Sequence, residues 1–198
     1  MRIFSGVYKG RTIQSPKGLK TRPTSGRLRE SLFNICQGYI EGTRFLDLFA
    51  GSGAMGFEAL SRGAGHVTFV DNSRESIRCI KDNAQLLGVN GQVEILYGDV
   101  FEVLGKLIKK ERPFDLIYAD PPYAVKSKEE GGELPYSVQV LEKVDQHPRA
   151  LLTSDGSLFL EDEADALSDH YMLTSLALES SRQMGRSALQ QFVINSAH

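Results

Sequence analysis

The sequence contains 198 residues, of which 41% are hydrophobic and 24% are charged, and its formal net charge is −2. This is the composition of an ordinary globular chain that can bury a core, and the length fits one domain or one domain with a small appendage. No apolar run approaches about 18 residues and the N-terminus lacks the apolar core of a signal peptide, so we exclude a membrane partner and expect a soluble, cytoplasmic protein.

Positive charge is concentrated at the N-terminus. Residues 1–30 contain eight Lys or Arg residues and one acid, a net charge of +7, whereas the remaining 168 residues contain 15 basic and 24 acidic residues, a net charge of −9. A basic arm of this kind favours contacts with the phosphates of a polyanion, with a merely solvated terminus as the alternative. The candidate phosphate-binding residues are Lys9, Arg11, Lys20, Arg22, Arg27 and Arg29.

The first predicted elements are a hairpin and a helix. Residues 2–13 alternate loosely around two glycines, which predicts the hairpin, and a turn-rich linker follows at residues 15–18. Thr24 or Ser25 offers an N-cap for the helix, whose apolar residues recur at helical spacing as far as Ile40.

This helix is predicted to lay its apolar face on the main domain, with Arg27 and Arg29 facing outward. We place a domain boundary near Gly42. Residues 1–42 then form a small basic hairpin-helix extension, and residues 43–198 form the main domain.

The next segment predicts a nucleotide-like ligand. Residues 45–56 read FLDLFAGSGAMG, an apolar strand followed by a glycine-rich turn and the start of a helix. Gly51 and Gly53 let the backbone approach a ligand, and the helix N-terminus offers free amide groups. A second strand, HVTFVD, ends in Asp71, whose carboxylate can accept hydrogen bonds from both ribose hydroxyls of a nucleoside.

Strand and helix then continue to alternate. Ser73 is a candidate cap for a helix that stops at Gly88, and a third strand, VEILYGD, ends in Asp99. A further helix is predicted from Val100 to about Lys110. This alternation predicts a parallel, doubly wound sheet.

Residues 114–123 read FDLIYADPPY, an apolar run that ends in Asp-Pro-Pro-Tyr. The run is typical of a central strand buried on both faces. Pro121 and Pro122 donate no backbone hydrogen bond and fix φ near −65°, so the strand must stop there. Asp120 and Tyr123 are therefore displayed on a stiff backbone at the carboxyl end of a strand, where open α/β sheets bind ligands.

The chemistry that suits this turn is methyl transfer to an exocyclic amine. The amine of a nucleobase is a poor nucleophile because its lone pair is delocalised into the ring. Two acceptors that bind both N–H groups would turn the lone pair toward an electrophile. The Asp120 carboxylate and the Pro121 carbonyl are candidate acceptors, while Tyr123 stacks on the base. An ordinary proline-rich turn is the alternative.

The rest of the chain completes the predicted sheet. Residues 124–136 are polar and form either a lid over the site or a surface loop. A helix is predicted over residues 137–147 and a fifth strand over residues 156–162. Two final runs, 171–180 and 187–195, predict a hairpin at the sheet edge. The predicted fold is therefore α/β and Rossmann-like, a mostly parallel seven-stranded sheet with a C-terminal antiparallel hairpin.

A dinucleotide-dependent dehydrogenase is an alternative for the glycine-rich turn. Residues 51–56 read GxGxxG, and Asp71 lies 20 residues after Gly51. However, Asp47 stands where dinucleotide sites usually carry an apolar residue, and a carboxylate there can orient an amino-acid moiety. Asp99 ends the next strand, and the Asp-Pro-Pro-Tyr turn has no role in hydride transfer. These features favour a methyltransferase.

These segments together resemble a known family. DLFAGSG with Asp71, Asp99 and DPPY is similar to class I S-adenosylmethionine-dependent methyltransferases that act on exocyclic amines. RIFSGVYKGR, TRPTSGRLRESLFNI and FLDLFAGSGAMGFEALSRGA resemble the RsmD family of bacterial 16S rRNA guanine-N2 methyltransferases. The resemblance runs over almost the whole chain.

This resemblance implies a monomer that binds S-adenosyl-L-methionine and methylates the N2 amine of a guanine in 16S rRNA, within a small-subunit ribosomal particle. The implied cofactor-binding residues are Asp47, Phe49, Gly51, Gly53, Asp71, Asn72, Asp99 and Val100. The residues implied to bind the target amine are Asp120, Pro121, Pro122 and Tyr123. The N-terminal basic residues would bind the RNA.

Two other functions remain open at this point. A DNA adenine-N6 methyltransferase shares the Asp-Pro-Pro-Tyr turn but usually needs a target-recognition domain too large for this chain. A noncatalytic RNA-binding assembly factor would not need the intact turn. Cys36 and Cys79 are isolated and the four histidines are scattered, so we expect buried reduced thiols and no metal site.

Overall fold

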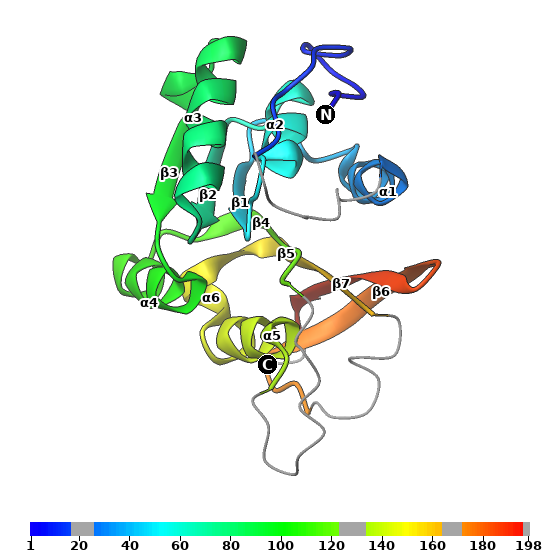
Figure 1. The fold of residues 1–198 in the computed structure, drawn as a ribbon. Coiled ribbons are helices and arrows are strands. Elements are labelled where there is room, and N and C mark those ends of the chain that lie inside the picture. The colour runs from blue at the N-terminus through cyan, green and yellow to red at the C-terminus, as the bar shows by residue number, and fades with distance from the viewer. Residues whose placement is uncertain (17–25, 123–133, 164–171, 196–198) are drawn as a thin grey trace.

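A seven-stranded sheet forms the centre of the part of the chain that the structure describes, in the order β3-β2-β1-β4-β5-β7-β6 (Figure 1). The structure is a computed structural model, and it describes residues 1–16, 26–122, 134–163 and 172–195. The parallel strands are β1 (Arg44–Leu48), β2 (His66–Asp71), β3 (Val93–Tyr97), β4 (Phe114–Ala119) and β5 (Leu152–Glu163). The antiparallel strands are β6 (Leu176–Met184) and β7 (Ser187–Ile194).

The strand order reverses between β1 and β4. The chain moves from β1 to β2 and β3 on one side of this point and from β4 to β5 on the other. The apolar sequences of β1 and β4 suit their central position, because helices cover both faces of these strands. The carboxyl ends of β1 and β4 therefore border the switch point of the sheet, where ligands bind in open α/β folds.

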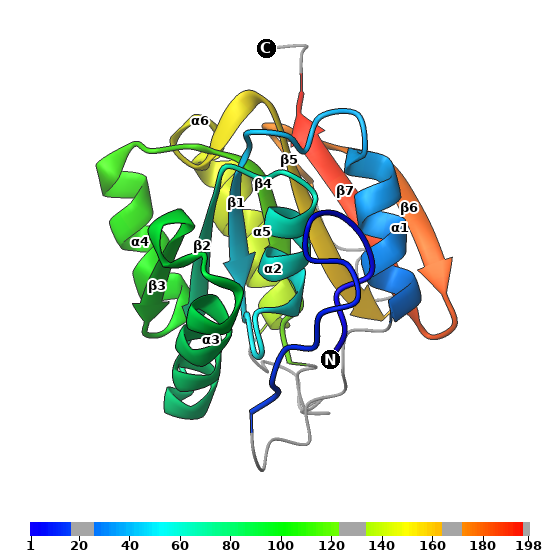
Figure 2. The same cartoon turned by 90° about the horizontal axis from the view of Figure 1, so that it is seen from above.

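Helices form a layer on each face of the sheet (Figure 2). On one face lie α1 (Gly26–Cys36), α2 (Ala54–Ser61) and α3 (Arg74–Leu87). On the other lie α4 (Val100–Lys110), α5 (Tyr136–Gln146) and α6 (Pro148–Leu151), and η1 (Asn90–Gln92) precedes β3. Strand side chains alternate between the two cores: Phe45 and Tyr118 pack with the first layer, and Leu46 and Ile117 with the second.

This arrangement confirms the predicted Rossmann-like α/β fold and its C-terminal antiparallel hairpin. The capping residues in the sequence predict both ends of α3 correctly. α3 begins after Ser73, whose hydroxyl oxygen accepts a hydrogen bond from the backbone N–H of Ser76 at 3.3 Å. The same helix ends at Gly88, which has a left-handed backbone with φ of 76°.

Three of the predicted strands have wrong boundaries, and one of them is the first strand of the hairpin, predicted over residues 171–180 but observed as β6, Leu176–Met184. β3 ends at Tyr97, because Asp99 caps α4 and does not continue the strand. β5 begins at Leu152, before the predicted start at Gly156. The predicted N-cap of α1 and the predicted lid as far as residue 133 lie outside the described residues.

The N-terminal residues pack on the same core as the sheet. An antiparallel bridge joins Arg2 to Thr12, as the predicted hairpin requires. Ile3 and Ile13 from this hairpin are buried in one cluster with side chains of α1, α2 and the central strands. The division of the chain near Gly42 stays a prediction, and its two parts share one hydrophobic core.

Arg29 does not face outward, which corrects the sequence prediction. Its side chain is 2% exposed, and its guanidinium carbon lies 4.2 Å from the centre of the Phe4 ring. Burial lowers the pKa of Arg29, and the nearby Glu58 carboxylate opposes this shift. Arg27, two residues earlier, is exposed as predicted. Arg29 therefore cannot contact a phosphate on the surface of this structure.

Cys36 and Cys79 are both free and buried, as the sequence predicts. Within the described ranges, no helix combines the length and the apolar character needed to cross a bilayer.

Candidate active site at the carboxyl edge of the sheet

The chain turns sharply between β1 and α2. Phe49 and Gly51 have positive φ angles of 58° and 56°, and Gly53 has a φ of 77° just before α2. A Cβ atom added to Gly51 would meet no other atom within 4 Å, so this side of the turn is open. A Cβ atom on Gly53 would lie 2.7 Å from the Phe57 ring. Gly51 thus leaves room for a ligand, whereas Gly53 lets the turn pack on α2.

Asp47 is a buried carboxylate in β1. Its Oδ2 accepts a hydrogen bond from the backbone N–H of Gly56, in the first turn of α2, at 3.0 Å. Burial raises the pKa of Asp47 well above its ordinary value, the Gly56 bond opposes this, and the charges of Asp71 and Asp120 raise it further. A cation beside Asp47 would stabilise its charged form, so this position suits the ammonium group of an amino acid.

Asp71 fastens the glycine-rich turn to the end of β2. Its Oδ2 accepts from the backbone N–H of Gly51 at 2.7 Å, and its Oδ1 accepts from the backbone N–H of Ser73 at 2.8 Å. An ionised carboxylate offers about four acceptor positions, so Asp71 can bind the turn and also accept from ribose hydroxyls. Asn72, the next predicted cofactor residue, is exposed at the same edge.

Asp99 and Val100, two predicted cofactor residues, both help to build α4. Asp99 Oδ1 accepts from the backbone N–H groups of Phe101 and Glu102 at 2.9 and 3.2 Å, which caps α4, while Oδ2 takes part in neither bond. The side chain of Val100 is buried in the core beneath α4. Of these two residues, Asp99 is the one whose side chain can offer a polar atom to a ligand.

Sequence analysis did not find an aromatic cluster that three separate elements bring together. The Phe49 and Tyr136 rings are stacked with centroids 6.2 Å apart, and the Phe101 and Tyr136 centroids are 5.8 Å apart. Tyr136, the first residue of α5, is 39% exposed. The cluster lies at the carboxyl edge because Phe49 follows β1 and Phe101 follows the cap of α4. It offers an aromatic surface suited to a purine ring.

The Asp-Pro-Pro turn follows β4 directly. β4 pairs with β1 and β5 as far as Ala119, so Asp120 follows the last paired residue of β4; β1 also ends there, at Leu48, whereas β5 continues to Glu163. Asp120 is partly buried, Pro121 is buried and Pro122 is exposed. Tyr123, the predicted stacking residue, lies outside the described residues. The described part of the turn therefore stands at the switch point of the sheet, on the strand next to Asp47.

A hydrogen-bonded pair of polar residues, Tyr118 and Glu161, lies beside Asp120, and sequence analysis did not predict it. The Tyr118 hydroxyl donates a hydrogen bond to Glu161 Oε2 at 3.0 Å, and both residues are buried. Burial raises the pKa of Tyr118 well above its ordinary value, and the charges of Asp120, Glu161 and Asp47 raise it further. Tyr118 therefore stays a hydrogen-bond donor at ordinary pH.

Comparison with known proteins places this chain in a family. The family described as "Conserved hypothetical protein 95" matches residues 1–192. The chain belongs to this family. Membership confirms the predicted resemblance to RsmD, because curated relatives include a protein named Ribosomal RNA small subunit methyltransferase D.

Two relatives and one solved structure show how far the similarity extends. YlbH of Bacillus subtilis is 42% identical over 123 residues, which cover 62% of this chain and 67% of YlbH. Ribosomal RNA small subunit methyltransferase D of Escherichia coli K12 is 38% identical over 124 residues, 62% of this chain and 60% of the relative. The matches thus span about two thirds or less of these relatives. The solved structure of yhhF from Escherichia coli has a TM-score of 0.78 and 26% identity, and the match covers 98% of both chains.

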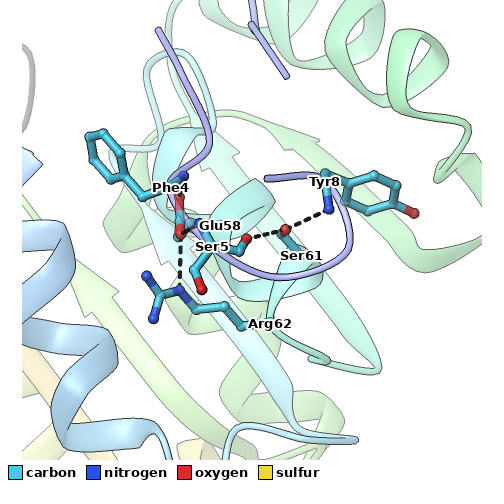
Figure 3. Close-up of polar contacts among 6 residues, drawn as sticks. All are labelled: Phe4, Ser5, Tyr8, Glu58, Ser61 and Arg62. Atoms are coloured by element: carbon cyan, nitrogen blue, oxygen red, sulfur yellow. Dashed lines mark hydrogen bonds and ion pairs between the residues drawn. The ribbon is translucent and has the colours of Figure 1, made fainter. Parts of the chain in front are cut away.

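In this member of the Conserved hypothetical protein 95 family, the N-terminal hairpin is tied to α2 (Figure 3). Glu58 is fully buried, and its carboxylate accepts from the backbone N–H groups of Phe4 and Ser5 at 2.9 and 3.0 Å. It also accepts from Arg62 Nε at 2.9 Å. The Ser61 hydroxyl accepts from the Tyr8 backbone N–H at 2.9 Å and donates to the Ser5 carbonyl.

The side chain of Asn83 connects this hairpin to the glycine-rich turn, and no pattern in the sequence predicts this role. Asn83 Oδ1 accepts from the Gln14 backbone N–H at 2.7 Å. Its Nδ2 donates to the carbonyl oxygens of Gln14 and Ser52, both at 3.1 Å. Ser52 lies between Gly51 and Gly53, so one amide bridges the N-terminal arm and the candidate cofactor site.

The structure describes four of the six predicted phosphate-binding residues. Lys9, Arg11 and Arg27 are exposed, and Arg11 Nη2 donates to the Leu86 carbonyl at 2.8 Å. Arg29 is buried, and Lys20 and Arg22 lie outside the described residues. Of the predicted residues that the structure describes, Lys9, Arg11 and Arg27 therefore remain as exposed candidates for RNA contacts.

Proposed function

We propose that the chain transfers the methyl group of S-adenosyl-L-methionine to the exocyclic N2 amine of a guanine in 16S rRNA. The observation that carries this proposal is the position of Asp120 and Pro121 at the switch point, on the strand next to the buried Asp47. The membership of the family and the names of its curated relatives support the choice of rRNA as the substrate. We further propose that the chain acts in the cytoplasm, where rRNA is found, and that it acts as a monomer on a small-subunit particle, as the family resemblance implies.

The residues around the glycine-rich turn fit this cofactor. Asp47 would pair with the ammonium group of its methionine part, and Asp71 would accept from its ribose hydroxyls. Gly51 leaves space for close approach, since a Cβ atom there would meet nothing within 4 Å. Asp99 and the cluster of Phe49, Phe101 and Tyr136 would flank its purine. When bound, the cofactor supplies a methyl group on a sulfonium, a strong electrophile.

The role of Asp120 and Pro121 is to prepare the amine. The Asp120 carboxylate and the Pro121 carbonyl would each accept one N–H of the target amine. With both N–H bonds held, the nitrogen lone pair points out of the base plane toward the methyl donor. The Asp120 carboxylate is also the group placed to take the proton that the amine releases as the new N–C bond forms.

We further propose that residues 1–42 form the RNA-binding extension of a methyltransferase domain over residues 43–198. Lys9, Arg11 and Arg27 are exposed and suit phosphate contacts. Lys20 and Arg22 are assigned the same role from the sequence alone. A target base would be flipped out of, or already lie in, a loop or helix end, because Asp120 stands at a sheet edge that a stacked base cannot reach.

The test is to incubate the protein and methyl-labelled S-adenosylmethionine with 16S rRNA, with isolated small subunits and with DNA. The nucleic acid is then digested to nucleosides and analysed by mass spectrometry. Label in N2-methylguanosine from 16S rRNA supports the proposal. Label in N6-methyladenine, or in DNA alone, refutes it in favour of a DNA adenine methyltransferase. Binding to RNA without any label in all three substrates would indicate a noncatalytic assembly factor.

A further inference from the structure

The register of β4 and β5 places a second carboxylate beside Asp120. The two strands are parallel, and their last pairs are Tyr118 with Phe159 and Ala119 with Leu160. Glu161 is the next residue on β5 and Asp120 directly follows the end of β4, and neighbouring strands lie about 4.8 Å apart. Tyr118 and Phe159 pack on the α1 and α2 side of the sheet. Because side chains alternate along a strand, Glu161 starts from that same side.

Glu161 is held in a defined orientation. Its Oε2 accepts the hydrogen bond from the Tyr118 hydroxyl at 3.0 Å, and the Tyr118 ring is fixed in the core. Glu161 is 9% exposed, so it borders the carboxyl edge of the sheet without extending into solvent. A carboxylate has about four acceptor positions, so it can keep contacts within the protein and still bind a ligand. We therefore expect Glu161 to keep its bond to Tyr118 and also accept a hydrogen bond from a base that Asp120 holds.

A carboxylate at this position distinguishes guanine from adenine. In guanine the ring nitrogen N1, next to the carbon that bears the N2 amine, carries a hydrogen and is a donor. In adenine the ring nitrogen N1, next to the carbon that bears the N6 amine, has a lone pair and is an acceptor. A carboxylate facing N1 is thus attracted to guanine and repelled by adenine, whereas Asp120 and Pro121 alone would serve either amine.

We propose that Glu161 is the residue that selects guanine, by accepting the N1–H bond while Asp120 and the Pro121 carbonyl hold the N2 amine. This inference rests on the proposed function and deepens it, because it assigns the discrimination between bases to one side chain. Tyr118 is its positioning residue, since the Tyr118 hydroxyl sets the direction of the Glu161 carboxylate.

The test compares guanine with 2-aminopurine at the target position. 2-Aminopurine keeps the exocyclic amine on C2, but its N1 has a lone pair and no hydrogen. The methylated guanine is first located by mapping the label on 16S rRNA. The substrate is a synthetic RNA segment that contains this position. If the naked segment is not methylated, it is reconstituted into a particle with ribosomal proteins before the assay. The measured quantity is the ratio of kcat/KM for guanine to that for 2-aminopurine.

The wild-type protein is expected to prefer guanine by roughly 10- to 100-fold, the usual range for one base-reading contact. In Glu161→Gln the side-chain amide can donate to the N1 lone pair of 2-aminopurine, so the ratio should fall to near one while the Kd for S-adenosylmethionine changes less than about twofold. Asp162→Asn is the matched control, because Asp162 starts from the opposite side of β5 and should leave the ratio unchanged.

Tyr118→Phe provides a second variant, which keeps the Glu161 carboxylate and removes the hydroxyl that orients it. Its ratio should lie between those of the wild type and Glu161→Gln. The inference is overturned if Glu161→Gln slows both substrates by the same factor, or if the wild type already accepts 2-aminopurine as well as guanine. Failure of the proposed function has a separate signature: the wild-type protein would place the methyl label in a nucleoside other than N2-methylguanosine.

Discussion

Glu58→Gln should weaken the attachment of the N-terminal hairpin to α2 and lower the free energy of unfolding by about 2–4 kcal/mol. Glu58 is fully buried and accepts three hydrogen bonds: Oε2 from the Phe4 N–H, and Oε1 from the Ser5 N–H and Arg62 Nε. Glutamine has nearly the same shape but only one acceptor oxygen. In its better orientation the oxygen keeps Ser5 and Arg62, and the NH₂ group faces the Phe4 N–H, donor against donor.

The magnitude follows from these three contacts. Hydrogen bonds to a charged partner contribute about 1.5–3 kcal/mol each, so the lost Phe4 bond alone accounts for most of the lower figure. The two surviving bonds change from a charged to a neutral acceptor, which weakens each by about half. Relief of the desolvation cost of a buried carboxylate offsets part of this loss and keeps the total below a simple sum of three bonds.

The measurement is equilibrium unfolding in urea, combined with hydrogen exchange of the Phe4 and Ser5 amides. Glu41→Gln is the matched control, because Glu41 is exposed and the same chemical change there should stay within about 0.5 kcal/mol. In Glu58→Gln the amides of Phe4 and Ser5 should exchange faster than those of the central strands. A stability within about 0.5 kcal/mol of the wild type, with unchanged protection of these two amides, would refute the reasoning.

Three further outcomes are expected. Asp120→Ala should abolish methyl transfer and leave the calorimetric Kd for S-adenosylmethionine within a few fold, whereas Asp71→Ala should mainly weaken cofactor binding; parallel losses in both quantities for Asp120→Ala would contradict the assignment. Arg27→Gln should lower the slope of log K against log salt for RNA binding by about 0.7–0.9, and Arg29→Gln, at a buried position, should leave that slope unchanged. Asp145 accepts four hydrogen bonds at the start of β6, which outweigh burial and lower its pKa. Its contribution to stability is therefore present above the ordinary pKa of about 4 and lost as the pH falls through the lowered value, so the destabilisation of Asp145→Asn in urea should shrink between pH 7 and about pH 3.

Elements that depend on neighbouring residues in the sequence were predicted well. The Ser73 cap and the Gly88 stop define α3 because both act on the backbone within one helical turn. The apolar run of β4 and the prolines after it likewise determine where that strand ends. Asp99 was misread for a local reason, since an acid after an apolar run can end a strand or cap the next helix. The position of the candidate site followed from these elements, because parallel strands present their carboxyl ends at one edge.

Contacts between distant residues could not be predicted. The charge of Arg29 suggested an exposed position, but the Phe4 ring covers it, and nothing in the helix sequence reports that partner. Tyr118 and Glu161 are 43 residues apart, and each looked like an ordinary member of its own strand. The same holds for Phe49, Phe101 and Tyr136, whose shared surface exists only when three elements come together.

The anchoring of the N-terminal hairpin also has a consequence for synthesis of the chain. Phe4, Ser5 and Tyr8 are made before Glu58 and Ser61, which bind them and follow 53 or 54 residues later in the chain. Gln14 is made 69 residues before its hydrogen-bond partner Asn83. Such long-range pairs close late, because the intervening loop must be ordered before they form. The N-terminal hairpin is therefore made before all of these partners, and its contacts are complete only once the second strand–helix unit of the sheet has formed.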